Sequence, residues 1–312
     1  MKKYAFGVDI GGTTCKIGFF NTEGTLLDKW EIKTNTENNG ESILSDVAKS
    51  VDNKLAQEGI SKDEVQGIGV GVPGPVDSKG VVHRCVNLGW ATVDVEEELS
   101  SLTGLKVKAG NDANVAALGE MWQGGAKGCT DVIMVTLGTG VGGGIIVDGK
   151  IVAGFNGAGG EIGHITVNND EIEACNCGQY GCLEQYTSAT GIVRLAKRKL
   201  AKSTDETSIR AIENLTAKDV FDAAKAGDAV AIRLVDEVCE ILGSTLSNIA
   251  CVVNPEIIVI GGGVSKAGSI LIENIRKHFV ETSFMACRDT KFALASLGND
   301  AGMYGCVKML LD

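Results

Sequence analysis

Short apolar runs and a longer helical pattern alternate along the first part of the chain. Four of these runs predict strands: 4–9, 16–20, 25–33 and 68–72. A glycine turn at 11–14 joins the first two runs. Before the fourth run, Ile43, Val47, Val51 and Leu55 recur every fourth residue, which places them on one face of a helix.

The same order returns in the second half of the chain. Apolar runs predict strands at 132–137, 145–147 and 150–152, with a glycine turn at 138–144 and a hairpin turn at Asp148-Gly149. The segment 228–253 is helical and apolar on most sides, so we expect a buried helix that Pro255 ends, followed by a strand at 257–260. Alternating strands and helices predict an α/β protein, and its halves look like a distant duplication.

The composition narrows the class of protein. The 312 residues include 42 Gly and 3 Pro, whereas ordinary usage would give roughly 22 and 16. Because 44% of the residues are hydrophobic and no G-x-y period runs through the chain, disorder and fibrous structure are excluded. At about 150 residues per domain, the length predicts two domains with a cleft between them.

Charge and cysteine content exclude further classes. Lys+Arg is 29 and Asp+Glu is 40, so the net charge is −11, and binding to nucleic acid or an anionic membrane surface needs clustered cations instead. No apolar run approaches the about 18 residues of a membrane helix. Ten Cys spread over the chain fit reduced thiols or a metal site better than disulfides. We therefore expect a cytoplasmic protein without nucleic-acid or membrane partners.

Gly138, Gly140 and Gly143 match the dinucleotide fingerprint G-x-G-x-x-G, with Glu161 about 20 residues further on. That fingerprint requires a helix after the glycines, because the pyrophosphate binds at the helix N-terminus. Here a strand and a tight turn follow, which disfavours a dehydrogenase.

Two glycine turns instead carry hydroxyl groups, Thr13 and Thr14 in one and Thr139 in the other. Such turns can point backbone N–H groups at a polyphosphate, although they could also be plain hairpin turns. Asp9, at the end of the first strand, could hold Mg²⁺ through waters. Gly261, Gly262 and Gly263 end a strand, where open α/β sheets bind ligands, and suit the adenosine moiety.

Asn111 and Asp112 follow a strand expected at 106–109 and precede a helix through Val115, Leu118 and Trp122. Either residue could simply cap that helix. The functional alternative makes Asp112 a general base, which accepts the proton of a sugar hydroxyl as that hydroxyl attacks a γ-phosphoryl group.

A cysteine cluster follows the glycine-rich stretch 154–160. Cys175, Cys177 and Cys182 lie within eight residues, and His164 lies eleven residues before the first of them. Three thiols and an imidazole are the ligand set of a closed, structural Zn²⁺ site. Buried thiols or a redox pair are the alternative.

These residues resemble the ROK family of bacterial sugar kinases and sugar-responsive repressors, and the resemblance covers essentially the whole chain. The segments that carry it are 9–13, 72–75, 111–114, 137–144, 161–164 and the cysteine cluster ending in Glu184. The family implies the actin-like ATPase fold, in which two ribonuclease-H-like domains close over Mg-ATP and a sugar. The expected domains are a smaller one of 1–110 plus 299–312 and a larger one of 111–298 with the zinc site.

The resemblance assigns roles by position. Asp112 becomes the catalytic base for the sugar 6-hydroxyl. The sugar-binding residues become Gly74, Asn87, Asn111, Asp112, Glu161, His164 and Glu184. His164 serves twice, because metal on one ring nitrogen leaves a donor on the other.

The candidate nucleotide-binding residues complete the expected site: Asp9, Gly11, Gly12, Thr13, Thr14, Lys16, Gly138, Thr139, Gly140, Gly261, Gly262 and Gly263. Many relatives carry Lys directly after the first Thr, whereas this chain has Thr14 there and its lysine at 16. Many of the repressors have an N-terminal DNA-binding domain, and the start of this chain at the phosphate loop favours an enzyme.

The run Asn87-Leu88-Gly89-Trp90 is similar to that of the family's bacterial glucokinases, which implies glucose as the substrate and a place in glycolysis. A kinase for N-acetylmannosamine or another amino sugar shares every motif and stays open as an alternative. A non-catalytic sugar sensor is the alternative from another class. The family also implies a homodimer or homotetramer.

Overall fold

The computed structural model describes residues 2–312, which form two compact units. Unit 1 comprises the chain up to Gly128 together with Gly144–Gly160 and Ser296–Asp312. Unit 2 comprises Cys129–Gly143 and Glu161–Ala295. Within residues 2–312, no helix has both the length and the apolar character that a membrane span requires.

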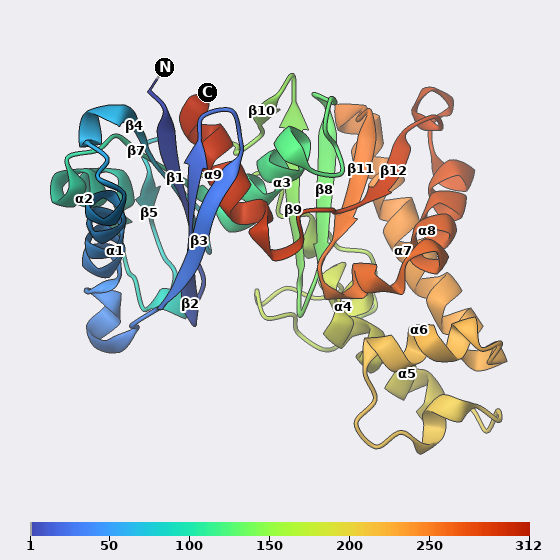
Figure 1. Cartoon of the computed structure of the whole chain (residues 1–312). Helices are drawn as coiled ribbons and strands as arrows, with labels where there is room; N and C mark the ends of the chain where they lie inside the picture. Colours follow the sequence, from blue (N-terminus) through green and yellow to red (C-terminus); the bar gives the residue numbers. More distant parts are fainter. Residues whose placement is uncertain (1) are drawn as a thin grey trace. The chain divides into compact units, whose positions relative to one another are not determined.

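Unit 1 contains a five-stranded sheet in the order β3-β2-β1-β4-β7 (Figure 1). Its strands are β1 (Tyr4–Ile10), β2 (Thr14–Asn21), β3 (Leu26–Lys33), β4 (Val65–Val72) and β7 (Val107–Asn111). β1 is antiparallel to β2 and parallel to β4. Asp9 lies opposite Lys16 on β2 and Gly71 on β4, so the end of β1 that carries Asp9 is fixed by both neighbours.

Helices cover both faces of this sheet. They are α1 (Ile43–Glu58), α2 (Val95–Thr103), α3 (Asp112–Gln123) and α9 (Ala301–Leu311). Phe6, Val8 and Ile10 belong to the core that includes α1 and α2, whereas Ala5 packs with residues of α9. Because side chains alternate along a strand, Asp9 shares the α9 face with Ala5. A small hairpin, β5 (Val81–Val82) and β6 (Val93–Asp94), precedes α2.

A second five-stranded sheet has the order β10-β9-β8-β11-β12. Its strands are β8 (Val132–Leu137), β9 (Val141–Val147), β10 (Lys150–Ile151), β11 (Ile257–Gly261) and β12 (Lys291–Leu294). In each sheet, three strands that are consecutive in the chain lie side by side and two parallel strands follow, so the two halves share one topology, as the predicted duplication requires. The predicted actin-like α/β fold is confirmed.

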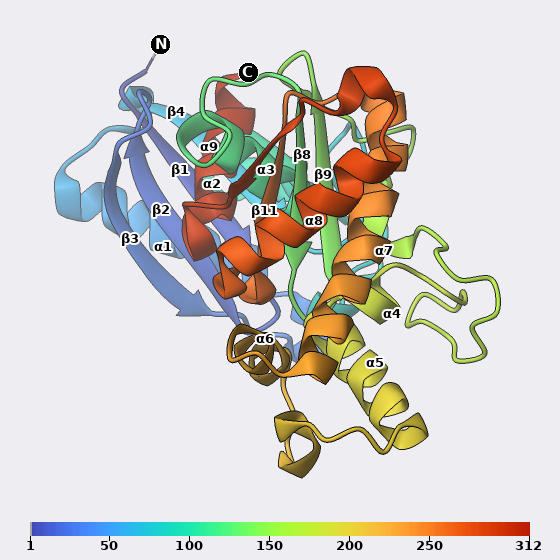
Figure 2. The same ribbon diagram turned by 90° about the vertical axis from the view of Figure 1, so that its right-hand side faces the viewer.

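The helices of unit 2 are α4 (Glu184–Thr187), α5 (Ala189–Lys202), α6 (Ala217–Lys225), α7 (Ala229–Val253) and α8 (Ser269–Thr282). α7 and α8 lie side by side (Figure 2). The prediction of a helix at 228–253 is confirmed, with Asp228 as its N-cap. Burial on most sides is wrong for the outer face, where Ile232 is 46% and Val252 82% exposed.

Short 3-10 helices complete the described chain: η1 (Glu37–Gly40), η2 (Lys62–Glu64), η3 (Val86–Leu88), η4 (Ile162–His164), η5 (Ser208–Ala211), η6 (Gly263–Ala267), η7 (Met285–Cys287) and η8 (Gly298–Asp300).

The glycine turn predicted at 138–144 is shorter in the structure, because β9 already begins at Val141. Gly144 is a strand residue with a packing role. A Cβ there would lie 2.6 Å from the Cβ of Ala117 and 3.0 Å from the carbonyl oxygen of Ala113, both on α3. The glycine therefore lets the strand approach the helix closely.

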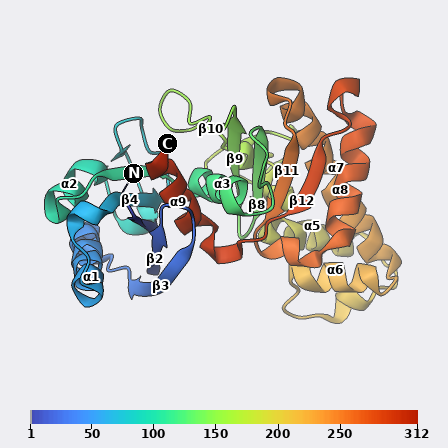
Figure 3. The same cartoon turned by 45° about the horizontal axis from the view of Figure 1, so that its top comes forward.

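The two units differ in extent from the expected domains of 1–110 plus 299–312 and 111–298. α3 follows the expected boundary but packs along α9 inside unit 1. Figure 3 shows these two helices next to each other. Glycines make this contact possible, since a Cβ at Gly305 would lie 1.5 Å from the carbonyl oxygen of Val115.

Candidate functional site

The loop at 11–14 is the hairpin turn between β1 and β2. The amide of Gly11 donates to the carbonyl oxygen of Thr14 at 3.0 Å. Thr34, just after β3, clamps the loop: its hydroxyl donates to the Gly11 carbonyl at 2.6 Å and its amide to the Thr13 carbonyl at 2.9 Å. Gly12 and Thr13 stay exposed at the tip. Sequence reasoning missed Thr34, because no motif marks a residue that acts only as a clamp.

Asp9 lies directly before this loop, in a space that Gly302 keeps open. A Cβ at Gly302 would lie 2.8 Å from Cγ and Oδ2 of Asp9. Burial raises the pKa of the Asp9 carboxyl, and the charge of Lys16 opposes that shift. The Lys16 ammonium donates to the carbonyl oxygen of Asn299 at 3.4 Å. One partly buried carboxylate beside an exposed glycine loop suits a hydrated Mg²⁺ that is shared with phosphate oxygens.

Asn111 and Asp112 occupy different positions at the start of α3. Asn111 is the N-cap of α3, since its Oδ1 accepts from the amides of Ala113 and Asn114 at 3.0 and 3.1 Å. Its Nδ2 donates to the carbonyl oxygen of Gly74 at 3.1 Å. Asp112 is the first residue of α3, and its Oδ1 accepts from the Ala113 amide at 2.8 Å. The capping alternative therefore holds for Asn111, whose side chain also ties Gly74 to the start of the helix.

Gly74 and Asn87 both belong to this side of unit 1. Gly74 adopts φ 99°, a left-handed conformation that suits glycine. Asn87 lies beside the phosphate loop, because a Cβ on Gly12 would be 3.6 Å from its carbonyl oxygen and 3.8 Å from its Cβ. Cys85 is a neighbour that sequence reasoning did not assign: burial raises the pKa of its thiol, and the charge of Asp112 raises it further.

In unit 2, the start of α5 holds the turn at 138–140. The amide of Ala189 donates to the Gly138 carbonyl at 2.8 Å, and the hydroxyl of Thr190 donates to the Thr139 carbonyl at 2.7 Å. Gly140 lies against Glu184, because a Cβ there would be 2.6 Å from Glu184 Oε2. The second glycine turn is therefore joined to the carboxylate that the resemblance assigns to the sugar.

Gly263, just after β11, lines a mostly apolar cavity of about 280 Å³, whereas Gly261 and Gly262 do not line it. Gly262 adopts φ 80° and approaches Leu137, whose carbonyl oxygen would be 2.5 Å from a Cβ. Gly263, Val264 and Ala267 form one wall of the cavity, and Phe221 lies on another. Small residues and one aromatic ring around a cavity of this size suit a flat heterocycle.

His164 lies between two carboxylates of unit 2. Its Nδ1 is 4.0 Å from Glu184 Oε1, and its Nε2 is 4.0 Å from Glu161 Oε2. Glu184 also accepts from the Cys175 thiol at 2.9 Å and from the Val141 amide at 3.4 Å. The three candidate sugar ligands of this unit are therefore neighbours.

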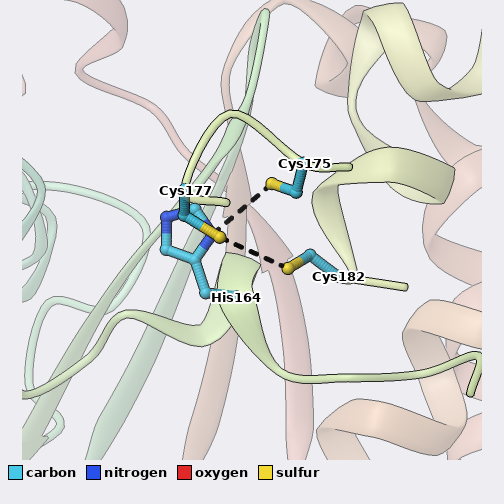
Figure 4. A group of neighbouring side chains, drawn as sticks. All are labelled: His164, Cys175, Cys177 and Cys182. Atoms are coloured by element: carbon cyan, nitrogen blue, oxygen red, sulfur yellow. Dashed lines mark hydrogen bonds between the residues drawn. The ribbon is translucent and has the colours of Figure 1, made fainter. Parts of the chain in front are cut away.

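His164, Cys175, Cys177 and Cys182 bring one donor atom each to within 4.8 Å of one another (Figure 4). The Sγ atoms of Cys177 and Cys182 are 3.6 Å apart, and Nδ1 of His164 is 3.9 Å from Sγ of Cys175. Tetrahedral zinc with ordinary bond lengths separates its ligands by about 3.3–3.8 Å, so these two separations are close to those that the ion requires, and three thiols with one imidazole are a suitable ligand set. Nδ1 is the ring nitrogen that faces the thiols, which leaves Nε2 toward Glu161.

The chain matches known proteins along almost its entire length. The model of the ROK family matches residues 5–312. A glucokinase of Halalkalibacterium halodurans is 45% identical over 313 residues, which cover 97% of this chain and 93% of the relative. A glucokinase of Thermotoga maritima is 36% identical over 98% of this chain and 96% of its own length.

Among solved structures, the ROK family glucokinase from Streptomyces griseus in complex with glucose and AMPPNP superposes with a TM-score of 0.76. It is 33% identical, and the match covers 98% of each chain. Family model, relatives and fold agree, and the chain belongs to the ROK family.

Proposed function

We propose that this protein is an ATP-dependent glucokinase that transfers the γ-phosphoryl group of ATP to the 6-hydroxyl of glucose. The identity of 45% to a glucokinase along nearly the whole chain supports the reaction. The placement of Asp112 at the start of α3, beside Asn111 and Gly74, supports the assignment of the base. We further propose a cytoplasmic homodimer or homotetramer in glycolysis, without nucleic-acid or membrane partners.

Three glycines in the expected nucleotide loops support the assignment of the nucleotide site. Most glycines here either adopt a positive φ or leave no room for a Cβ. Of the glycines whose surroundings the structure describes, Gly12, Gly138 and Gly263 have neither a positive φ nor a close neighbour. The atom nearest to a Cβ would lie at 3.6 Å for Gly12, at 4.0 Å for Gly138 and beyond 4 Å for Gly263. The protein's own packing therefore gives no reason for glycine at these three places. One lies in each expected nucleotide loop, where backbone would approach a ligand.

The chemistry follows from the placement of the residues. The Ala113 amide orients the carboxylate of Asp112, which takes the proton from the 6-hydroxyl as the sugar oxygen forms its bond to the γ-phosphorus. The bond from that phosphorus to the β,γ-bridging oxygen breaks, and ADP leaves with the electron pair. Amides of the two glycine turns neutralise charge on the transferred group. Closure of the domains would exclude the water that could otherwise accept the phosphoryl group.

Asp9 would hold Mg²⁺, which supplies positive charge to the phosphates. Glu161, Glu184 and Nε2 of His164 would bind sugar hydroxyls, while Nδ1 and the three thiols would bind zinc. Zinc there is structural, because four protein ligands leave no open position. Its effect would be to fix the loop that carries His164 next to Glu184.

A substrate panel tests the proposed reaction. With Mg-ATP and glucose, mannose, N-acetylglucosamine or N-acetylmannosamine, we expect kcat/KM for ADP formation to be at least ~10-fold higher with glucose than with either N-acetylhexosamine. A higher value with N-acetylmannosamine would support the amino-sugar kinase instead. Calorimetric glucose binding without any ADP formation would support the sugar sensor.

Asp112→Asn tests the base. The variant keeps the size of the side chain, so we expect an unchanged Tm and glucose affinity, while kcat falls at least ~10²-fold because the carboxamide cannot accept the proton. Asn111→Asp is a useful comparison, since a carboxylate can still cap the helix and the variant tests whether a nearby charge suffices. Near-normal turnover in Asp112→Asn removes this residue from the role.

Gly138→Ala tests the nucleotide turn, with Gly144→Ala as its matched control. A methyl group at 138 would lie no closer than 4.0 Å to the carbonyl oxygen of Gly140, so we expect little loss of Tm. We expect a KM for ATP raised about tenfold, because the methyl group keeps the turn amides from approaching phosphate. A methyl group at 144 would collide with α3, so that variant should lose stability by about 1–3 kcal/mol. An unchanged KM for ATP in Gly138→Ala would argue for a plain hairpin turn.

Metal analysis tests the zinc site. Protein purified without added metal should contain about one zinc per chain, and Cys177→Ala should contain much less. The exposed Cys251 lies outside the cluster, so Cys251→Ala should keep the wild-type content. Wild-type protein with less than about half an equivalent of zinc, and with titratable thiols at the three cluster cysteines, would favour the buried-thiol alternative.

A further inference from the structure

Glu120 is a buried carboxylate that the proposed chemistry does not use. It lies on α3 and is 0% exposed. Its Oε2 accepts from the amides of Gly125 at 2.7 Å and Ser296 at 3.0 Å, and its Oε1 accepts from the amide of Leu297 at 2.9 Å. Among residues 2–312, the hydrogen-bond partners described for this carboxylate are backbone amides, and none of them is a cationic side chain. Three oriented amides therefore replace the cation that a buried carboxylate would otherwise require.

The three amides that bind Glu120 belong to segments where the chain passes between the two units. The chain passes between the two units four times, after Gly128, Gly143, Gly160 and Ala295. Ser296 and Leu297 are the first two residues of the last return to unit 1. Gly125 lies in the turn that leads from α3 to the first exit at Gly128. One carboxylate thus binds the unit 1 ends of two of the four crossovers.

The backbone of Glu120 strengthens the same junction. Its carbonyl oxygen accepts from the amides of Gly124 at 3.1 Å and Ala126 at 3.0 Å. A Cβ on Gly124 would lie 2.1 Å from Glu120 Oε2, so the carboxylate fills the space that a side chain there would need. The turn at 124–126 therefore packs directly against the Glu120 carboxylate and leaves no room for a side chain at 124.

The junction is close in sequence to the proposed catalytic groups of unit 1. Glu120 follows Asp112 by eight residues of α3, a rise of about 12 Å along the helix. Leu297 precedes Gly302 by five residues, and Gly302 is the glycine that makes room for Asp9. A shift of the anchored segments would therefore be transmitted to both groups through α3 and α9.

We propose that Glu120 is a positioning residue that anchors two crossovers and so controls domain closure during phosphoryl transfer. This role rests on the proposed kinase function, because closure matters where water must be kept from ATP. The alternative is that Glu120 contributes stability alone. The two roles differ in what happens to a variant that is still folded.

Glu120→Gln separates them, with Asp228→Asn as the matched control. The glutamine keeps the volume but replaces one accepting oxygen with a donor, which leaves one or two of the three amides without an acceptor. Asp228 in unit 2 likewise accepts three amides, from Val230 and Ala231 at 3.0 Å each and from Ser208 at 2.7 Å. It binds no residue next to a crossover, so its loss should cost stability without changing closure.

Three measurements are made on both variants and the wild type, at a temperature where all three are folded. We expect hydrogen exchange in Glu120→Gln to accelerate at 124–128 and 296–298, kcat with glucose to fall about tenfold with less than a twofold change in glucose affinity, and the glucose-induced decrease in radius of gyration to shrink. Asp228→Asn should show faster exchange only around 206–212 and 228–232, with wild-type kcat and scattering.

Equal kcat in the two variants, or unchanged exchange at 296–298 in Glu120→Gln, would overturn the proposal. If the glutamine variant does not fold, Glu120→Asp retains the charge and withdraws the oxygens by one methylene, and the same expectations apply in weaker form. Hydrogen exchange depends neither on glucose nor on catalysis. A wild-type protein that fails to phosphorylate glucose would therefore contradict the proposed function, while exchange at 124–128 and 296–298 still decides whether Glu120 anchors the crossovers.

Discussion

Unit 1 depends on backbone approaching backbone where α9 packs against α3 and the first sheet. A Cβ at Gly305 would lie 1.5 Å from the Val115 carbonyl, and one at Gly7 would lie 2.1 Å from the Met303 carbonyl. No rotamer change relieves such contacts, because the obstructing atoms belong to the main chain. The glycines therefore fix how near α9 comes to β1 and α3, which carry Asp9 and Asp112. The same packing that forms the core sets the positions of both carboxylates.

Unit 2 uses side-chain contacts for the same purpose. Glu184 contacts the glycine turn through the Val141 amide, the cysteine loop through Cys175 and the imidazole of His164. Another carboxylate, that of the buried Glu171, binds Arg194 and Arg198 of α5, and the hydrogen bond from Arg198 helps to hold the pKa of Glu171 well below its usual range. The cysteine loop is thus tied to α5, which in turn holds the turn at 138–140. The residues proposed to bind metal, sugar and phosphate in this unit are therefore linked to one another by hydrogen bonds and ion pairs.

The pattern of apolar residues and glycines correctly predicted those elements of the fold that depend on residues close together in sequence. Residues close together in sequence set the strand, turn and strand of each half, the helix that contains Ile43 and Leu55, and the long helix before Pro255. The structure has all of these elements. The glycine stretch at 138–144 misled the turn prediction because glycine serves close packing at Gly144 as well as turns. No sequence pattern predicted the role of Glu120, because its hydrogen-bond partner Ser296 is 176 residues away. The cap role of Asn111 and the base role proposed for Asp112 also look alike in sequence, because both residue types occupy helix starts.

Backbone amides take the place of basic side chains in several parts of this acidic chain. Glu120 is held by three amides, and Glu256 accepts from those of Thr130 and Asp131. Burial opposes ionisation of Asp228. Hydrogen bonds from the backbone amides of Ala231 and Ser208 and from nearby hydroxyl groups nevertheless hold the pKa of that carboxyl well below its usual range. A chain with a net charge of −11 thus holds some of its own anionic groups without cations. Oriented amides in the loops that contain Gly12 and Gly138 could hold phosphate in the same way, so the lack of a basic composition disfavours nucleic acid but not a nucleotide. For such a chain, the useful sequence signal of anion binding is a glycine that packing and turn geometry do not require, rather than a cluster of lysines.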